Sequence, residues 1–197
     1  MNRVTDEVLV QQTISGDTTA FEQLVERYQK QIYSLAYRLT NDAEDALDLS
    51  QEVFLKLYQV LDKFDSNYKF FSWMYKIATN VCYTKLRKKN SEEAVSLDKV
   101  IDFTPLVPPN EDQQPESYSE RREVERLVQQ AIAELPDKYR IPLVLRYLEE
   151  MTYQQIAETL ELPLTTIETR LYRGKSLMRK RLSIFLERGE RDALSRS

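Results

Sequence analysis

The sequence contains no histidine, a single cysteine and only three glycines in 197 residues. The missing histidine excludes His-based catalytic triads and His-containing metal sites, and one cysteine excludes a disulfide within the chain. Cys82 lies between apolar and aromatic neighbours, which is typical of a small buried residue rather than of a reactive thiol. Enzymatic chemistry would have to use carboxylates, lysine, serine or threonine, and no arrangement of these stands out. We therefore predict a protein that is not an enzyme and that binds no metal and no cofactor.

Long hydrophobic runs are also missing. The chain has no apolar stretch of about 18 residues, the length needed to cross a bilayer, and the N-terminal MNRVTDEVLVQQ has no signal-peptide core. These absences predict a cytoplasmic protein with no segment inserted in a membrane. Hydrophobic residues make up 42% of the chain and charged residues 30%, which indicates a globular protein. Few glycines and much Leu, Gln, Glu, Lys and Ala favour an all-α fold.

Apolar residues recur every three or four positions over most of the chain, which indicates amphipathic helices. Asn41 with Glu44, and Thr152 with Gln155, have the spacing of capping boxes at helix starts. The expected helices span residues 6–15, 18–39, 42–61, 70–89, 119–135, 136–148, 153–160 and 165–186.

Residues 92–118 interrupt this periodicity. Between Ser91 and Glu120 there are eight acids, four prolines and one cation, Lys99, a composition that favours a flexible linker. We therefore expect two small helical domains, at residues 1–91 and 119–190, joined by an acidic linker.

Charge is segregated along the chain, although the net charge is only −4. An acidic block without a cation spans Asp42 to Glu52, and all six charges from Arg170 to Arg181 are positive. Local patches rather than the total charge steer partners. A basic C-terminal helix and an acidic linker in one chain also predict that the free protein binds duplex DNA poorly.

The stretch from Phe64 to Lys89 interleaves aromatic rings with lysines and ends in a basic run. Unpaired bases stack on aromatic rings while cations follow the phosphates, so this pattern suits single-stranded nucleic acid. A core helix with a solvated basic end has the same pattern, since Trp73 and Ile77 are spaced as core residues. The residues alone leave both interpretations open.

The segment from Thr152 to Leu182 has the form of a helix-turn-helix. Ile156, Ala157 and Leu160 are expected to face inward, and small Ala157 would let the second helix approach closely. Such a second helix fits the major groove, where its polar N-terminal residues meet base edges and its cations meet phosphates. A plain helical hairpin with a basic end is the alternative. The outward positions predicted to contact DNA, which the family resemblance described below assigns to the −35 element, are Thr165, Thr166, Glu168, Thr169, Arg170, Arg173 and Lys175.

The chain as a whole resembles the compact, two-domain sigma factors of the extracytoplasmic-function group. The residue pair Phe21…Tyr28 and the blocks DAEDALDLSQEVFLKLY (Asp42 to Tyr58) and FFSWMYKIATNVCYTKLRKK (Phe70 to Lys89) are similar to regions two-one to two-four of that family. The block LPDKYRIPLVLRYLEEMTYQQIAETLELPLTTIETRLYRGKSLMRKRL (Leu135 to Leu182) resembles region four. The resemblance spans roughly Val8 to Leu186. Three ordered blocks are a specific signal, whereas the helix-turn-helix alone is shared by many regulators.

The resemblance implies a transcription initiation factor that binds core RNA polymerase, recognises −35 and −10 promoter elements and promotes promoter melting, often in a stress response. The partners it implies are the clamp helices and flap of the large polymerase subunits, promoter DNA and an anti-sigma factor, which in this family is often anchored in the membrane. The polymerase contacts carried over are Asp45, Asp48, Gln51, Glu52 and Phe54. The −10 DNA contacts carried over are Phe64, Phe70, Phe71, Ser72, Trp73, Lys76, Asn80, Arg87, Lys88 and Lys89.

The turn and the second helix of the helix-turn-helix depart from the family pattern at three places. A glycine common in the turn is Glu161 here, the usual small-Thr pair is Leu164-Thr165-Thr166, and a common cation is Glu168. An acid at residue 168 repels phosphate but can accept a hydrogen bond from cytosine N4. These departures affect the −35 preference and not the predicted fold.

Two other function classes are compatible with parts of the sequence. A free-standing helix-turn-helix regulator would bind its operator without polymerase and would have no use for the aromatic residues of 64–89. A nucleic-acid-processing enzyme would need carboxylates arranged around Mg²⁺, but the acids of residues 42–52 spread along a helix and the chain has no phosphate-binding glycine loop.

Overall fold

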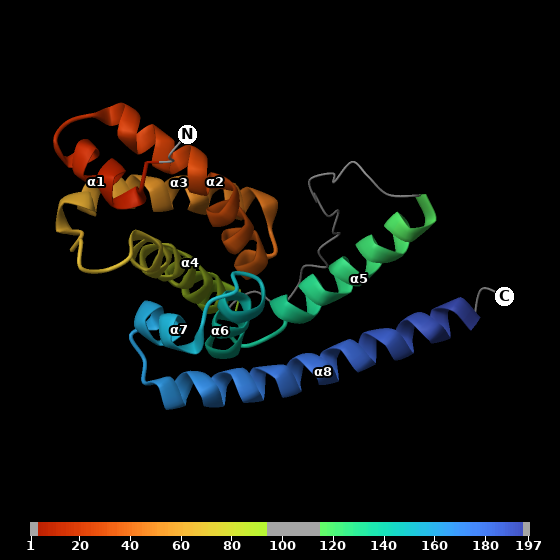
Figure 1. Cartoon of the computed structure of the whole chain (residues 1–197). Coiled ribbons are helices and arrows are strands. Elements are labelled where there is room, and N and C mark those ends of the chain that lie inside the picture. Colours follow the sequence, from red (N-terminus) through yellow and green to blue (C-terminus); the bar gives the residue numbers. More distant parts are fainter. Residues whose placement is uncertain (1–3, 94–114, 195–197) are drawn as a thin grey trace.

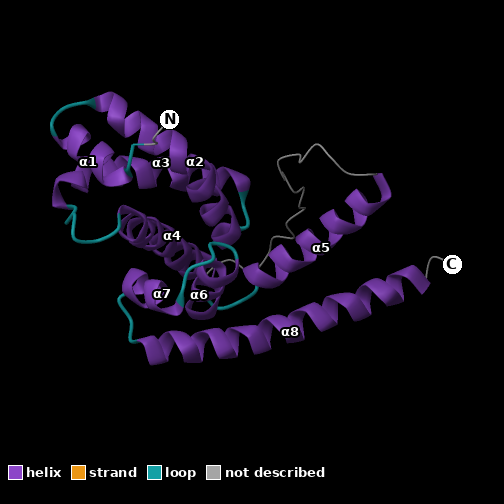
Figure 2. Cartoon of the chain, in the orientation of Figure 1, coloured by secondary structure: helices purple, strands orange, loops and turns teal. Residues whose placement is uncertain are grey.

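The computed structural model describes residues 4–93 and 115–194, and within these ranges it consists of helices and connecting loops (Figure 2). The prediction of an all-α fold is confirmed. None of the described helices combines the length and the low polarity that a bilayer crossing requires. The elements are α1 (Asp6–Ile14), α2 (Thr18–Thr40), α3 (Ala43–Val60), the short 3-10 helix η1 (Leu61–Lys63), α4 (Phe70–Glu93), α5 (Pro115–Ala133), α6 (Asp137–Tyr147), α7 (Tyr153–Leu160) and α8 (Leu164–Leu194).

The first two helices begin where the sequence predicts, and each ends within one residue of its predicted end. Gly16, at φ 101°, lies just past α1 and takes a left-handed conformation that a side chain would strain. The Asp17 side chain accepts a hydrogen bond from the Thr19 N–H at 2.9 Å and so caps α2. Asp6 then ties α1 to α2 through the Arg27 guanidinium and the Tyr28 hydroxyl.

The predicted capping box at Asn41 is wrong by one residue. Asn41 ends α2 in a left-handed conformation, φ 58°, and its N–H donates to the Tyr37 carbonyl. Asp42 is the residue that caps α3, because its side chain accepts from the Asp45 N–H at 2.9 Å. Asn tolerates positive φ better than other non-glycine residues, so the pair Asn41-Asp42 stops one helix and starts the next.

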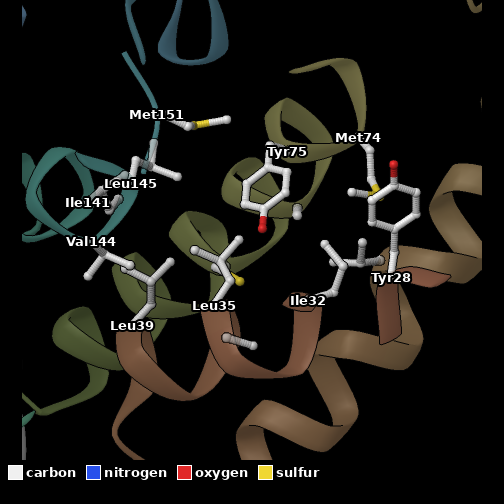
Figure 3. Packing of buried hydrophobic residues seen from close by; sticks show 14 of the residues in the cluster. Tyr28, Ile32, Leu35, Leu39, Met74, Tyr75, Ile141, Val144, Leu145 and Met151 are labelled. Atoms are coloured by element: carbon white, nitrogen blue, oxygen red, sulfur yellow. The ribbon is translucent and has the colours of Figure 1, made fainter. Parts of the chain in front are cut away.

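Helix α4 lies at the centre of the molecule (Figure 1), between α2 and α3 on one side and α6 and α7 on the other. Figure 3 shows Leu35 and Leu39 of α2 with Tyr75 of α4 and Val144 of α6, all buried, in one cluster. The core is therefore continuous across the two halves of the chain. Such burial stabilises the arrangement by about 25 cal/mol for each Å² of apolar surface.

The second half contains the predicted helix-turn-helix. Thr152 and Gln155 form the expected capping box, in which each side chain accepts from the other residue's N–H. Helix α7 has the predicted bounds, whereas α8 continues eight residues beyond the predicted end, to Leu194. Helix α5 begins at Pro115, before the predicted start at Ser119. The linker predicted for 92–118 falls mostly on residues 94–114, which lie outside the described ranges.

Candidate nucleic-acid interface

The N-terminal half of α8 presents one polar face to solvent. Its exposed residues Thr165, Glu168, Thr169 and Tyr172 are spaced i, i+3, i+4 and i+7, so they form a single stripe. Tyr172 is 79% exposed, more than a packed aromatic would be. This stripe has the composition and reach to enter a groove of duplex DNA.

The face of α8 opposite this stripe is buried, so the stripe points to solvent. Ile167 and Leu171 are buried on the side of α8 that packs against α6 and α7, and Ala157 of α7 is buried as well. Of the other predicted −35 residues, Arg173 and Lys175 are exposed, whereas Thr166 and Arg170 are half-buried. Arg173 together with Lys138 lowers the pKa of Tyr139, chiefly through a hydrogen bond from Arg173. The Lys175 ammonium lies 5.7 Å from the centre of the Tyr147 ring.

The turn between α7 and α8 contains Glu161 where the family commonly has glycine. Glu161 has φ 53°, and its N–H and that of Leu162 donate to carbonyls at the end of α7, including the Ala157 carbonyl. This is the geometry in which a helix ends on a left-handed residue, and glycine adopts it without strain. The departure seen in the sequence is therefore a strained position in the structure.

A second polar face lies on α4. Lys76, Asn80, Tyr83 and Arg87 follow one another at helical spacing, and the last three are exposed. Lys88 is exposed as well, Ser72 is half-buried, and the side chain of Lys89 lies outside the described residues. Two of the predicted cations and the predicted Asn80 are thus available to a phosphate backbone.

The aromatic residues at the start of α4 have unequal exposure. Phe64 and Phe70 are 7% and 1% exposed, with their ring centres 5.8 Å apart. Trp73 and Phe71 are half-buried; Trp73 packs 5.3 Å from Phe64, and Phe71 packs 4.5 Å from Tyr75. The expectation that Phe64 and Phe70 offer their faces to a base does not hold in this arrangement, because both rings fill the core. The core interpretation therefore applies to Phe64 and Phe70, and the half-buried rings of Trp73 and Phe71 remain predicted contacts for a base.

An acidic face covers the outer side of α3. Asp48, Gln51 and Glu52 are exposed, and Phe54 is half-buried at their edge. Two apolar side chains, Leu47 (51% exposed) and Leu55 (66% exposed), lie on the same side of the helix. This side of α3 therefore combines carboxylates with exposed apolar side chains.

Asp45 differs from the other acids of α3. The Lys85 ammonium of α4 lies 3.0 Å from its carboxylate, and this hydrogen bond raises the pKa of Lys85. Asp45 thus joins α3 to the basic end of α4, and we assign it a smaller part in any polymerase contact. Nearby, burial raises the pKa of the Cys82 thiol to about 12, as expected for an inert core cysteine.

The faces on α4 and on the helix-turn-helix meet at the junction of the two halves. The Tyr75 hydroxyl donates to the Glu149 carboxylate, and the Lys76 ammonium lies 2.7 Å from a Glu161 oxygen. Burial raises the pKa of Glu149. The hydrogen bond from Tyr75 and the positive charge of Arg38 act in the opposite direction but do not cancel this effect. Beside this contact is a cavity of about 330 Å³ lined by residues that include Lys30, Phe71 and Glu150.

The end of α2 is capped by side chains from the second half. Gln129 donates to the carbonyls of Tyr37 and Arg38 at 3.3 and 3.2 Å, and Arg140 donates to the Leu39 carbonyl at 2.8 Å. The last carbonyls of a helix have no partner within the helix and carry partial negative charge. The Arg140 guanidinium, also bound by Asp137, therefore fits this end chemically.

Four exposed residues were missed by the sequence-based site assignment: Leu47, Leu55, Tyr83 and Tyr172. A signal was present for each. Leu47 and Leu55 fall outside the buried stripe of α3, which contains Ala46, Leu49, Val53 and Leu57. Tyr83 and Tyr172 fall at helical spacing from predicted polar contacts. An apolar residue on the polar side of an amphipathic helix has no core to enter.

Family models match both halves of the chain. The model for Sigma-70 region 2 matches residues 24–92, and the model for Sigma-70, region 4 matches residues 125–178.

Several characterised proteins are similar to this chain over nearly its whole length. The ECF RNA polymerase sigma factor SigW of Bacillus subtilis is 35% identical over 178 residues, which cover 88% of this chain and 94% of SigW. The RNA polymerase sigma-H factor of Pseudomonas aeruginosa is 32% identical and covers 92% of this chain and 95% of its own length. The ECF RNA polymerase sigma-E factor of Escherichia coli K12 is 30% identical, with 94% and 98% covered.

Two solved structures have a similar fold. CnrH, in complex with the cytosolic domain of CnrY, has a TM-score of 0.65 at 24% identity, covering 92% of this chain and 97% of the CnrH chain. The sigma factor RpoE of Bartonella quintana, in complex with the anti-sigma factor NepR, has a TM-score of 0.65 at 20% identity, covering 83% and 97%.

Proposed function

This chain belongs to the extracytoplasmic-function group of the sigma-70 family, and from that premise we propose how its surfaces divide the work of initiation. As such a sigma factor it acts with RNA polymerase in transcription initiation and promoter recognition, and it is not itself an enzyme. The polymerase performs nucleotidyl transfer. A polymerase-independent regulator is therefore no longer a competing interpretation.

The exposed face of α3 is the proposed contact with core polymerase. Asp48, Gln51 and Glu52 supply charge and hydrogen bonds, and Leu47 and Leu55 supply apolar surface. A basic partner helix, such as a clamp helix, would complement this face. Exposed leucines flanked by carboxylates are the single observation that carries the proposal, because a solvated face gains nothing from exposing them.

The exposed stripe of α4 is the proposed contact with the −10 strand. Lys76, Arg87 and Lys88 would follow phosphates, while Asn80 and Tyr83 would meet an unpaired base. We propose a supporting role for Phe64 and Phe70, whose buried rings pack against Trp73 and hold it at the surface. Base stacking then falls to the half-buried rings of Trp73 and Phe71.

The stripe of α8 is the proposed contact with −35 DNA. Thr165, Glu168 and Thr169 are near the start of the helix, where side chains reach base edges. Tyr172, which continues the stripe, would add an apolar contact, and Arg173 would bind a phosphate. Arg170 and Thr166 are half-buried and would contribute less.

We propose boundaries of 1–91 for the polymerase and −10 domain, 92–118 for the linker and 119–190 for the −35 domain. The separate family matches to regions two and four support this division. An anti-sigma factor is the proposed regulator, because a structural relative is a sigma factor held by one. We place the chain in the cytoplasm, with the polymerase it serves.

The polymerase contact is tested by charge reversal. Replacing Asp48 and Glu52 together by Lys should abolish co-purification with core polymerase, since both carboxylates would then repel a basic helix. The melting temperature should hardly change, because both residues are exposed. The matched control is Glu22→Lys with Glu26→Lys, also exposed and four residues apart, on α2. Equal polymerase recovery from both double variants would refute the assignment.

A further inference from the structure

The proposed −10 face and the helix-turn-helix are in direct contact in the isolated chain. The Glu161 carboxylate lies 2.7 Å from the Lys76 ammonium, at the edge of the interface between α7 and α4. A carboxylate at hydrogen-bond distance from an ammonium satisfies the same donor that a phosphate would use. Lys76 therefore cannot be fully available to DNA while this contact is present.

A second contact, made by the residue next to Lys76, reinforces the first. The Tyr75 hydroxyl donates to the Glu149 carboxylate, which lies in the connection between α6 and α7. Tyr75 is 1% exposed, and this hydrogen bond ties its buried side chain to the second half of the chain. Two acids of the second half thus hold two consecutive residues of α4.

The backbone around these acids is strained. Glu161 has φ 53° and Glu150, next to Glu149, has φ 55°, a left-handed conformation that L side chains adopt at a cost. Glycine or asparagine would take either position with less strain. At residue 161 the carboxylate of Glu161 contacts α4, a contact that glycine could not make.

The other two proposed surfaces remain free in this arrangement. Asp48 and Glu52 on α3 and Thr165 and Tyr172 on α8 are all exposed. The closed chain can therefore meet polymerase through α3 while its −10 lysine is occupied. Only the face needed for promoter opening is affected by the contact.

We propose that the turn of the helix-turn-helix is an intramolecular brake on the −10 face, in which Glu161 occupies Lys76 in place of a phosphate. The brake rests on the proposed function of Lys76 at the −10 strand. The charge pattern of the sequence predicted that the free protein binds duplex DNA poorly, and the acidic linker lies mostly outside the described residues. The contact with Lys76 is made by the turn. Release requires α7 to move away from α4, which binding of polymerase to one half and duplex to the other would favour.

The first measurement uses the free, full-length chain and a fluorescein-labelled 12-mer of deoxythymidine at fixed salt. Glu161→Gln removes the charge of the brake and keeps the side-chain shape. It should tighten binding of this oligonucleotide by about two- to fivefold, the range that one exposed ion pair can supply. The control, Glu150→Gln, makes the same change of net charge at an exposed residue with the same backbone conformation, and should leave binding unchanged. Equal tightening in both variants would show a general charge effect and overturn the brake.

The second measurement needs no DNA and no polymerase. Acetic anhydride is reacted with the free chain, and acetylation of Lys76 is followed by mass spectrometry with Lys56, an exposed lysine of α3, as internal reference. Glu161→Gln should raise the relative rate at Lys76 by a similar factor, and an unchanged rate overturns the contact itself. Faster acetylation without tighter oligonucleotide binding would show that the contact exists but that Lys76 does not bind the strand, and this would overturn the brake. The polymerase recovery test above is unaffected by either result.

Discussion

Tyr75 and Lys76 are neighbours in the sequence but differ in their exposure to solvent. Tyr75 is fully buried and bonds to Glu149, whereas Lys76 stays partly exposed and pairs with Glu161. The same division runs through the aromatic residues, where Phe70 fills the core and Trp73 stays half-exposed. Local spacing alone does not distinguish the two members of either pair. Asn80, one turn beyond Lys76, is exposed, and it separates a DNA role from a packing role most sharply.

Asn80→Ala should leave polymerase binding and the melting temperature unchanged, because no core contact is lost. On a duplex promoter it should impair open-complex formation, since losing one polar partner of an extruded base costs about 1–3 kcal/mol. A promoter already mismatched at −10 should be rescued only in part, because the base contact is still missing. Permanganate reactivity of the −10 thymines measures the effect, with Gln29→Ala, an exposed amide on α2, as control. Wild-type reactivity from the Asn80→Ala holoenzyme would exclude Asn80 from promoter opening.

Helix α7 shows how local signals build an element. Its eight residues are too few to form a stable helix alone, so the capping box at its start and the left-handed residue at its end both matter. Ile156 and Ala157 are then buried where α7 packs against α4, α6 and α8. Helix α8 packs against both α6 and α7, so the contacts of α7 contribute to the position of the proposed DNA-binding stripe.

Thr152→Ala should lower the free energy of unfolding by about 1 kcal/mol, the usual value of a lost N-cap. For a chain of this length, that corresponds to about 2–4 °C in melting temperature. Thr84→Ala is the matched control, since Thr84 is exposed within α4 and its hydroxyl bonds only the Asn80 carbonyl. Thermal unfolding by circular dichroism compares the two variants. An equal loss in both would mean that the cap makes no contribution of its own.

The whole molecule closes through polar groups that lie far apart in the sequence. Gln129 and Arg140 donate to the end of α2, and Glu149 and Glu161 bind α4. We therefore expect the closed form to depend on the protonation of Glu149, a half-buried acid. Glu149 faces Tyr75, the charge of Arg38 acts on it, and it shares a cavity with Lys30 and Glu150.

Closure should tighten as the pH falls. Burial raises the pKa of Glu149 in the closed form, whereas the same carboxyl would titrate normally once it is solvated in an open form. The closed form therefore binds a proton more readily, so closure is favoured at lower pH and weakened as the carboxyl ionises at higher pH. Small-angle X-ray scattering of the free chain should show a smaller radius of gyration toward acid pH.

Two variants separate the buried acid from its neighbour. Glu149→Gln mimics the protonated group and should remove most of the pH dependence. Glu150→Gln, at an adjacent exposed residue, should retain it. A radius of gyration that does not change with pH in the wild-type chain would argue against Glu149 as the titrating group.

Much of this protein was determined by the sequence alone. The apolar period of three to four residues, the Asp17 and Thr152 caps and the near absence of glycine predicted an all-α chain and the bounds of α7. Three ordered blocks predicted the family. These features are local or linear, so they do not depend on how the helices are arranged. The cap at Asn41 was misplaced because Asn41 and Asp42 both suit a helix boundary, and only the backbone shows which of them ends α2.

The tertiary structure alone decided which of these residues are accessible. Phe64 and Phe70 became core and Asp45 was bound by Lys85 because α4 packs against α2 and α3. Gln129 and Arg140 became the cap of α2 although they follow it by about a hundred residues in sequence. Periodicity shows that a helix has an apolar side, but which neighbour covers that side, and how far, depends on the packing of all the helices together. For that reason the contact between Glu161 and Lys76 could not be anticipated from either motif.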